Sequence, residues 1–151
     1  MVSSIMPSMA TTVREPPPLA REAWKLLFEL GRKKHGRLSA ALAELELTPA
    51  QGHALRLLEP DRPLAMSELA EALYCHASNV TGIVDRLEAR GLVERRPGQD
   101  RRVKTLALTE AGADVRERVV KLMSAPPPEI AALSAADQRA LRDILTRALA
   151  R

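Results

Sequence analysis

Residues 66–109 of the 151-residue chain are MSELAEALYCHASNVTGIVDRLEARGLVERRPGQDRRVKTLALT, and their pattern is the strongest indication of the fold. Its first part predicts a short helix capped by Ser67, a turn at Tyr74–Ala77 and a second helix that ends at Gly91. Apolar residues recur in the second helix at the spacing i, i+3, i+4 and i+7, which predicts one buried face: Val80, Ile83, Val84 and Leu87. Two short helices joined by such a turn form a helix-turn-helix.

A basic β-hairpin is predicted directly after this motif. The apolar period falls to about two in residues 92–95 and 103–108, which flank a charged tip at Pro97–Asp100. The ten residues 95–104 hold five basic side chains and one aspartate, so five minus one gives +4, the formal net charge of the whole chain. A basic hairpin in this position is a wing that can reach the phosphates or the minor groove of DNA.

The predicted second helix supplies candidate contacts to bases, because helix-turn-helix proteins insert this helix into the major groove. Its short polar side chains can bond to base edges or phosphates, and its arginine to a phosphate or a guanine. Gly82 costs about 1 kcal/mol relative to alanine in mid-helix. The functional interpretation is close approach of the backbone to DNA; the alternatives are tight packing on a neighbouring helix and sequence drift. The candidates are His76, Ser78, Asn79, Thr81, Gly82 and Arg86.

The wing supplies a second set of candidate DNA contacts, for which a solvated charged turn is the alternative. Its position beside the helix-turn-helix gives these residues a geometric reason to touch DNA. They are Arg95, Arg96, Asp100, Arg101, Arg102 and Lys104.

The flanking segments predict an association region around a DNA-binding domain at residues 48–109. Residues 1–18 lack an apolar period and end in three prolines, which predicts a flexible arm. Residues 19–47 contain a long amphipathic helix that must pack against a partner along much of its length. Residues 110–151 predict two further helices separated by prolines, so we expect 19–47 and 110–151 to form the dimerisation region.

Three side chains are predicted to cap the helices outside the helix-turn-helix. Thr48 is expected to form a capping box with Gln51 at the start of the helix before the helix-turn-helix. Thr109 and Ser134 are expected to cap the two helices that follow the wing.

Composition favours a mainly α protein with a small β-wing, since apolar residues make up 46% of the chain and aromatic residues only 2%. The single cysteine, Cys75, excludes an intrachain disulfide, and no apolar run is long enough to span a bilayer, so we expect a cytoplasmic protein. Cys75 and His76 lack a third ligand at zinc-like spacing, and Cys75 itself is expected to be a small buried hydrophobe. No phosphate loop, nucleophile elbow or His–Glu metal helix is present. We expect no enzymatic activity, metal or cofactor.

Several segments, taken in order, closely resemble the MarR family of bacterial regulators: Glu68–Ala70, Ser78–Arg95, Asp100–Arg102 and Leu106–Gly112. The resemblance implies a triangular homodimer that binds a pseudo-palindromic operator in double-stranded DNA, usually as a repressor. It also implies that Asp100 and Arg102 hold the wing tip and contact the minor groove. The chain departs from the family pattern at Gly82, where many relatives have a large residue, and at His76, where Ser is frequent, so Ser78 is expected to cap the second helix instead.

The resemblance further implies release from DNA by a small aromatic or carboxylate effector. Aromatic and polar residues near the expected junction of the two regions are the candidate lining, with ordinary core and surface positions as the alternative: Trp24, Phe28, His35, His53 and Tyr74. A winged-helix module that binds proteins instead of DNA is the alternative function, and a steep salt dependence of binding would argue against it.

Overall fold

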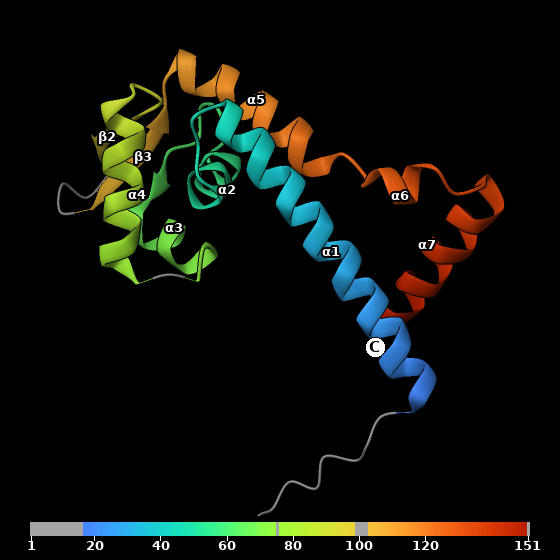
Figure 1. The fold of residues 1–151 in the computed structure, drawn as a ribbon. Coiled ribbons are helices and arrows are strands. Elements are labelled where there is room, and N and C mark those ends of the chain that lie inside the picture. Colours follow the sequence, from blue (N-terminus) through green and yellow to red (C-terminus); the bar gives the residue numbers. More distant parts are fainter. Residues whose placement is uncertain (1–16, 75, 99–102, 151) are drawn as a thin grey trace, which may run out of the picture.

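The computed structural model of the chain describes residues 17–74, 76–98 and 103–150, and the architecture in Figure 1 is mainly helical with one small sheet. The expected fold class is confirmed. Most of the predicted arm, together with Cys75, Asp100, Arg101 and Arg102, lies outside the described residues. The elements in chain order are α1 Pro18–Glu44, α2 Pro49–Leu57, β1 Leu64–Ala65, α3 Met66–Ala72, α4 Ala77–Ala89, β2 Val93–Pro97, β3 Lys104–Leu108, α5 Glu110–Ser124, α6 Pro128–Ala131 and α7 Ala135–Leu149.

The buried core lies at one end of the molecule, where α2, α3, α4 and the sheet pack against the end of α1 and the middle of α5. We call residues 47–109 the head. The largest fully buried side chains among the described residues are Leu42, Leu55, Leu58, Leu69, Leu87, Leu106, Val80, Val84, Val93 and Val119. Only the C-terminal end of α1 reaches this core, because Leu42 is its one buried residue. The rest of α1 extends away from the head, first beside α5 and then, in its N-terminal half, toward α7 (Figure 1).

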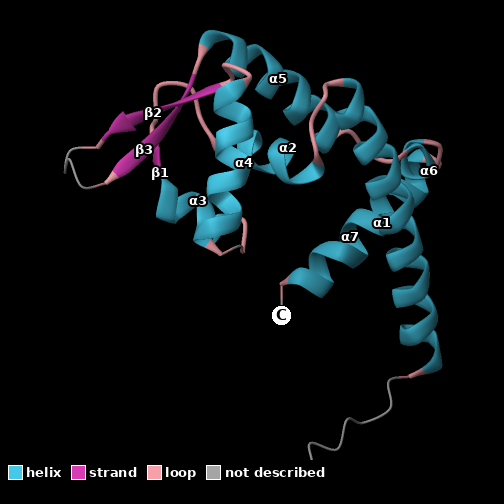
Figure 2. Ribbon diagram, turned by 60° about the vertical axis from the view of Figure 1, so that its left-hand side comes forward, coloured by secondary structure: helices cyan, strands magenta, loops and turns pink. Residues whose placement is uncertain are grey.

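The sheet has three antiparallel strands in the order β1-β3-β2, which lie beside the head helices in Figure 2. The hairpin of β2 and β3 is as predicted, with Val93 opposite Leu108 and Pro97 opposite Lys104. β1 was not predicted: Leu64 pairs with Leu106 and Ala65 with Thr105. A strand of two residues is too short to show the alternation on which sequence patterns depend.

Three predicted helix starts are confirmed by their caps. Thr48 and Gln51 form the expected capping box, in which the Gln51 side chain accepts from the Thr48 N–H at 2.8 Å. Thr109 accepts from the Gly112 N–H at 2.9 Å, and Ser134 accepts from the Asp137 N–H at 3.1 Å. A side-chain oxygen at such a position satisfies one of the amide groups that the helix leaves unbonded.

The predicted caps of the two helix-turn-helix helices are wrong. α3 begins one residue before Ser67; its N-cap is Ala65, whose N–H donates to the Glu68 carboxylate at 2.9 Å. α4 already begins at Ala77, so its N-cap is His76 and Ser78 lies within the first turn. Ser78 therefore is not the cap, and the His76 side chain, although at the N-cap position, makes no capping hydrogen bond.

Candidate nucleic-acid interface

The helix α4 has one buried and one exposed face, as its apolar spacing predicts. On one side of it Val80, Val84 and Leu87 are fully buried, whereas Ile83, predicted on the same face, is half-buried. Among the polar candidates, His76, Ser78, Asn79, Thr81 and Arg86 are all exposed. The structure therefore brings this set of sequence-predicted residues to one surface, along the first two and a half turns of α4.

Gly82 lies on this exposed surface and faces open space. A methyl group at this position would meet nothing within 4 Å in the described part of the chain, apart from the backbone of its own helix. Tight packing on a neighbouring helix therefore does not account for the glycine within one chain. Two explanations fit the open position: close approach of another molecule to the backbone, and sequence drift at a site without a role.

A shallow depression of about 410 Å³ runs between the start of α2 and the exposed face of α4. It gives the α4 surface a floor of small and polar side chains contributed by a second helix, which the sequence did not indicate. Its lining residues are Thr48, Ala50, Gln51, Ser78, Asn79, Gly82, Ile83 and Arg86.

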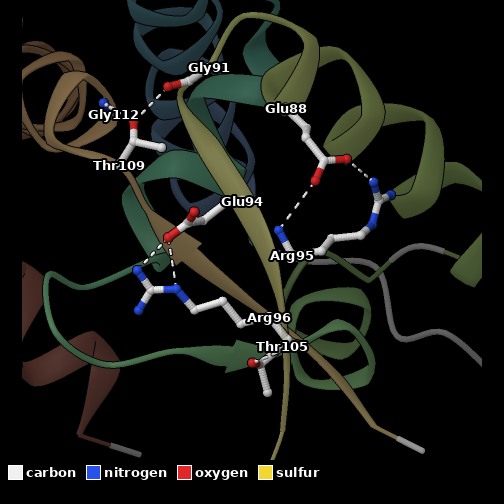
Figure 3. A network of polar contacts seen from close by, with 8 residues as sticks. All are labelled: Glu88, Gly91, Glu94, Arg95, Arg96, Thr105, Thr109 and Gly112. Atoms are coloured by element: carbon white, nitrogen blue, oxygen red, sulfur yellow. Dashed lines mark hydrogen bonds and ion pairs between the residues drawn. The ribbon is translucent and has the colours of Figure 1, made fainter. Parts of the chain in front are cut away.

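Arg95 of the wing lies against α4 instead of projecting from the hairpin (Figure 3). Its guanidinium bonds to Asp85 at 2.6 Å and forms an ion pair with Glu88, whose carboxylate also accepts from the Arg95 N–H at 3.2 Å. The hydrogen bond to Asp85 contributes most to raising the pKa of Arg95, which stays charged. These acidic partners were not predicted from the sequence, although Asp85 and Glu88 are spaced i, i+3 on one helix face.

The remaining described wing cations are exposed. Arg96 pairs with Glu94 on the same strand, and the Thr105 hydroxyl donates to the Arg96 carbonyl at 3.2 Å (Figure 3). Lys104 begins β3 opposite Pro97 and is exposed. The Gly98 N–H donates to the Val103 carbonyl at 2.8 Å, which keeps the two strands in register up to the tip.

The five candidate effector residues are not gathered into one cavity of this chain. Trp24 and Phe28 are exposed on the N-terminal half of α1, and Trp24 lines an apolar groove between α1 and α7. Tyr74 is 98% exposed after α3, in the left-handed region at φ 51°. His35 and His53 lie near each other: the pKa of His53 is lowered by burial, then by the charges of Arg56 and His35.

No group of three or more His, Cys, Asp or Glu side chains is placed to hold a metal ion among the residues that the structure describes. Over the same residues, no helix is both long and apolar enough to cross a membrane.

Comparison with known proteins gives a consistent match to one family. Residues 47–104, which cover most of the head, match the model described as the MarR family. The chain is 32% identical over 98 residues to the organic hydroperoxide resistance transcriptional regulator of Bacillus subtilis, covering 64% of this chain and 67% of that protein. It is 42% identical over 87 residues to the transcriptional repressor MdtR of the same organism, covering 57% of this chain and 56% of that one.

Solved structures extend the likeness to nearly the whole chain. The wild-type apo form of MarR from E. coli superposes with a TM-score of 0.73 at 28% identity, covering 90% of this chain and 99% of that chain. The S. aureus MepR F27L mutant, solved bound to an oligodeoxyribonucleotide, superposes with a TM-score of 0.62 at 25% identity, covering 84% of this chain and 96% of that chain. The chain therefore belongs to the MarR family of DNA-binding transcriptional regulators and is not an enzyme.

Proposed function

We propose that the chain acts as a homodimeric repressor that binds a pseudo-palindromic operator through α4 and the wing. The observation that carries this proposal is the exposed face of α4, where short polar side chains and an open glycine lie beside a basic hairpin. In the proposed complex Ser78, Asn79 and Thr81 face bases or phosphates in the major groove, and Arg86 takes a phosphate or a guanine.

The wing is proposed to enter the adjacent minor groove through Asp100, Arg101 and Arg102, with Arg96 and Lys104 near the phosphates. Arg95 was predicted to join this set, but two carboxylates already balance its charge. We assign Arg95 the role of holding the wing against α4, so that major-groove and minor-groove contacts keep a fixed relation to each other.

The homodimer is supported by the apolar surface outside the head. Trp24, Phe28 and Leu149 are each at least 65% exposed within one chain. Of the described residues in α7, none is buried. A 15-residue helix gains most of its stability from packing, so this surface needs a cover. A second copy of the chain fits best, because a two-fold axis lets the same apolar face of α1 and α7 cover itself. Sedimentation at several concentrations tests this: a monomer throughout would contradict the dimer.

Release by a small carboxylate effector is supported at one place in the chain. A hollow of about 370 Å³ between α2 and α5 is lined by Arg56 and Arg116 together with Val120, Met123 and Ser124. The charge of Arg56 also acts on His53, which lies one turn earlier on α2, so an imidazole stands near this cationic and apolar lining. Benzoate is a suitable probe, since it carries one carboxylate on an aromatic ring. Benzoate that leaves the DNA complex intact at concentrations saturating for the protein would argue against this site.

Repression, as opposed to activation, is supported by the similarity to MdtR, a transcriptional repressor that is 42% identical to this chain over 87 residues.

The test of the proposed function is a fluorescence-anisotropy titration of DNA from the chain's own upstream region, beside a scrambled duplex, at two salt concentrations. We expect tight binding of the native duplex only, weakened by salt because phosphate contacts release counterions, and lost in the Arg102→Ala variant. Equal weak binding of both duplexes would mean that the basic wing binds any DNA through its charge, or that the operator lies outside the upstream region. No binding at low salt would favour a protein-binding module.

A further inference from the structure

The C-terminal ends of α1 and α4 meet, and a single arginine joins them. Arg90 caps the end of α4, and its guanidinium donates to the Glu46 carbonyl at 2.7 Å and to the Leu45 carbonyl at 3.1 Å. Both carbonyls belong to the residues that terminate α1. α1 has no basic residue in its own last turn, so Arg90 supplies the positive charge that the negative end of that helix favours.

The acceptors of Arg90 are held rigidly. Glu46 lies in the left-handed region at φ 55°, and its N–H donates to the Ala43 carbonyl at 2.8 Å. The Leu47 N–H donates to the Leu42 carbonyl at 2.9 Å, which completes a Schellman motif. Leu45 and Leu47 are buried in the core on either side of Glu46. The two carbonyls therefore form a fixed anchor.

The end of α4 is built in the same way. Gly91 adopts φ 67° and its N–H donates to the Glu88 carbonyl at 2.8 Å, while the Leu92 N–H donates to the Leu87 carbonyl at 3.0 Å. Arg90 thus lies between two rigid helix ends and bonds one to the other. The ion pair of Arg90 with Glu46 spans 3.5 Å, and the Glu46 side chain is 85% exposed, so the pair contributes little and the carbonyl bonds carry the contact.

The position of this contact matters because a small rotation of α4 at its Arg90 end displaces its other end by a larger distance. α4 is about 18 Å long from its first to its last residue, and its candidate DNA contacts cluster near the end opposite Arg90. A rotation of about 10° at the Arg90 end would displace the other end by about 3 Å. Hydrogen bonds to base edges tolerate only about 0.5 Å of variation in length.

We propose that Arg90 is a positioning residue that fixes the direction of α4 relative to α1, and thereby the separation of the two α4 helices in the dimer. The inference rests on the homodimer proposed above, in which α1 belongs to the shared region. Arg90 itself does not touch DNA in this account; it acts through the backbone of residues 45 and 46.

The test measures the distance between the two α4 helices without DNA, by pulsed electron spin resonance on the full chain. A spin label is attached at Ser78→Cys, near the free end of α4, in a Cys75→Ser background that removes the native thiol. The parent protein is expected to give one narrow distance distribution. Arg90→Met is expected to broaden it by about 3 Å or more, as the leverage predicts. Arg90→Lys keeps the charge but not the two-pronged donor, so it is expected to give an intermediate width.

Two controls separate positioning from loss of charge or of folding. Glu46→Gln removes the ion pair but leaves both carbonyl acceptors, and it should keep the parent width. Lys121→Met removes an exposed cation from α5 and should also keep it. Urea unfolding identifies a variant that fails to fold, in which case Arg90→Lys alone carries the comparison.

Equal widths in the parent and in folded Arg90 variants would overturn the inference and leave the dimer intact. Broadening by Glu46→Gln as large as that by Arg90→Met would also overturn it, because the ion pair would then be the link. A parent protein with no dipolar signal would refute the homodimer and this inference together.

Discussion

Gly82→Ala is expected to stabilise the fold and weaken DNA binding at the same time. Gly82 lies in the interior of α4, is exposed, and has no described neighbour within 4 Å that an added methyl group would strike. Alanine in mid-helix is favoured over glycine by about 1 kcal/mol, so the free energy of unfolding should rise by about that amount. Urea denaturation at fixed protein concentration measures it, since the stability of a dimer depends on concentration.

The same methyl group would stand on the surface proposed to face the major groove. If the backbone approaches the bases there, the added carbon must push the helix outward. A misfitted contact typically costs about 1.4 kcal/mol or more, so we expect the Kd for the operator to rise at least about tenfold. Binding to a scrambled duplex should change little, because phosphate contacts dominate it.

Gly36→Ala is the matched control, since Gly36 is also exposed in mid-helix and a Cβ there would meet no described neighbour within 4 Å. It should gain similar stability and keep the parent Kd, with the oligomeric state of both variants checked by sedimentation. Unchanged or tighter operator binding by Gly82→Ala would refute the assignment of this glycine to close DNA approach. Loss of stability would show that the position is not open.

Substitutions at three further positions test the packing and charges described above. A Cβ at Gly112 would lie 1.8 Å from the Leu92 carbonyl oxygen, so Gly112→Ala should lower the unfolding free energy by about 3 kcal/mol or more, measured by urea denaturation; a loss below about 1 kcal/mol would contradict the packing described. Arg95→Met should lower the unfolding free energy by about 1 kcal/mol in the same assay, because it leaves the carboxylates of Glu88 and Asp85 without their cation. Arg95→Lys should recover only part of this loss, since lysine cannot bond to both carboxylates. Full recovery would count against the bridge between Arg95 and the two carboxylates. The pKa of His53 is below its ordinary 6.5, so the unfolded chain takes up a proton at higher pH than the folded one. The unfolding free energy should therefore fall as pH drops from 6.5 through the lowered pKa, and His53→Gln should flatten this dependence in urea midpoints measured between about pH 7.5 and about pH 5; an unchanged slope would refute the assignment to His53.

The sequence predicted those parts of the fold that repeat along the chain. The apolar period placed α4 and buried Val80, Val84 and Leu87, and side-chain caps placed the starts of α2, α5 and α7. The sequence failed to predict helix starts at which the N-cap side chain makes no hydrogen bond. The N-caps of α3 and α4 are Ala65 and His76, neither of which makes a capping bond through its own side chain, so no residue type marked them.

The candidate site was predictable in composition but not in its internal contacts. Exposure of the polar face of α4 follows from the helical period alone. Partners that lie in other elements cannot be found in this way: nothing in the local pattern says that Arg95 would fold back onto Asp85, or that Arg90 would reach Glu46, 44 residues earlier. Charge counting placed Arg95 among the free wing cations because it treats every cation as available.

Operator binding by a two-fold dimer is best tested by selecting duplexes of about 30 base pairs from a random-sequence pool and sequencing those that bind. The selection does not require the operator sequence to be known. A homodimer that inserts one α4 per half-site should enrich an inverted repeat. Its two arms should be centred about one helical turn, or a whole number of turns, apart. The enrichment should disappear in the Arg86→Ala, Arg102→Ala double variant. Several rounds without enrichment of any sequence, or enrichment of a single arm with no symmetry, would contradict operator binding by a two-fold dimer through α4 and the wing.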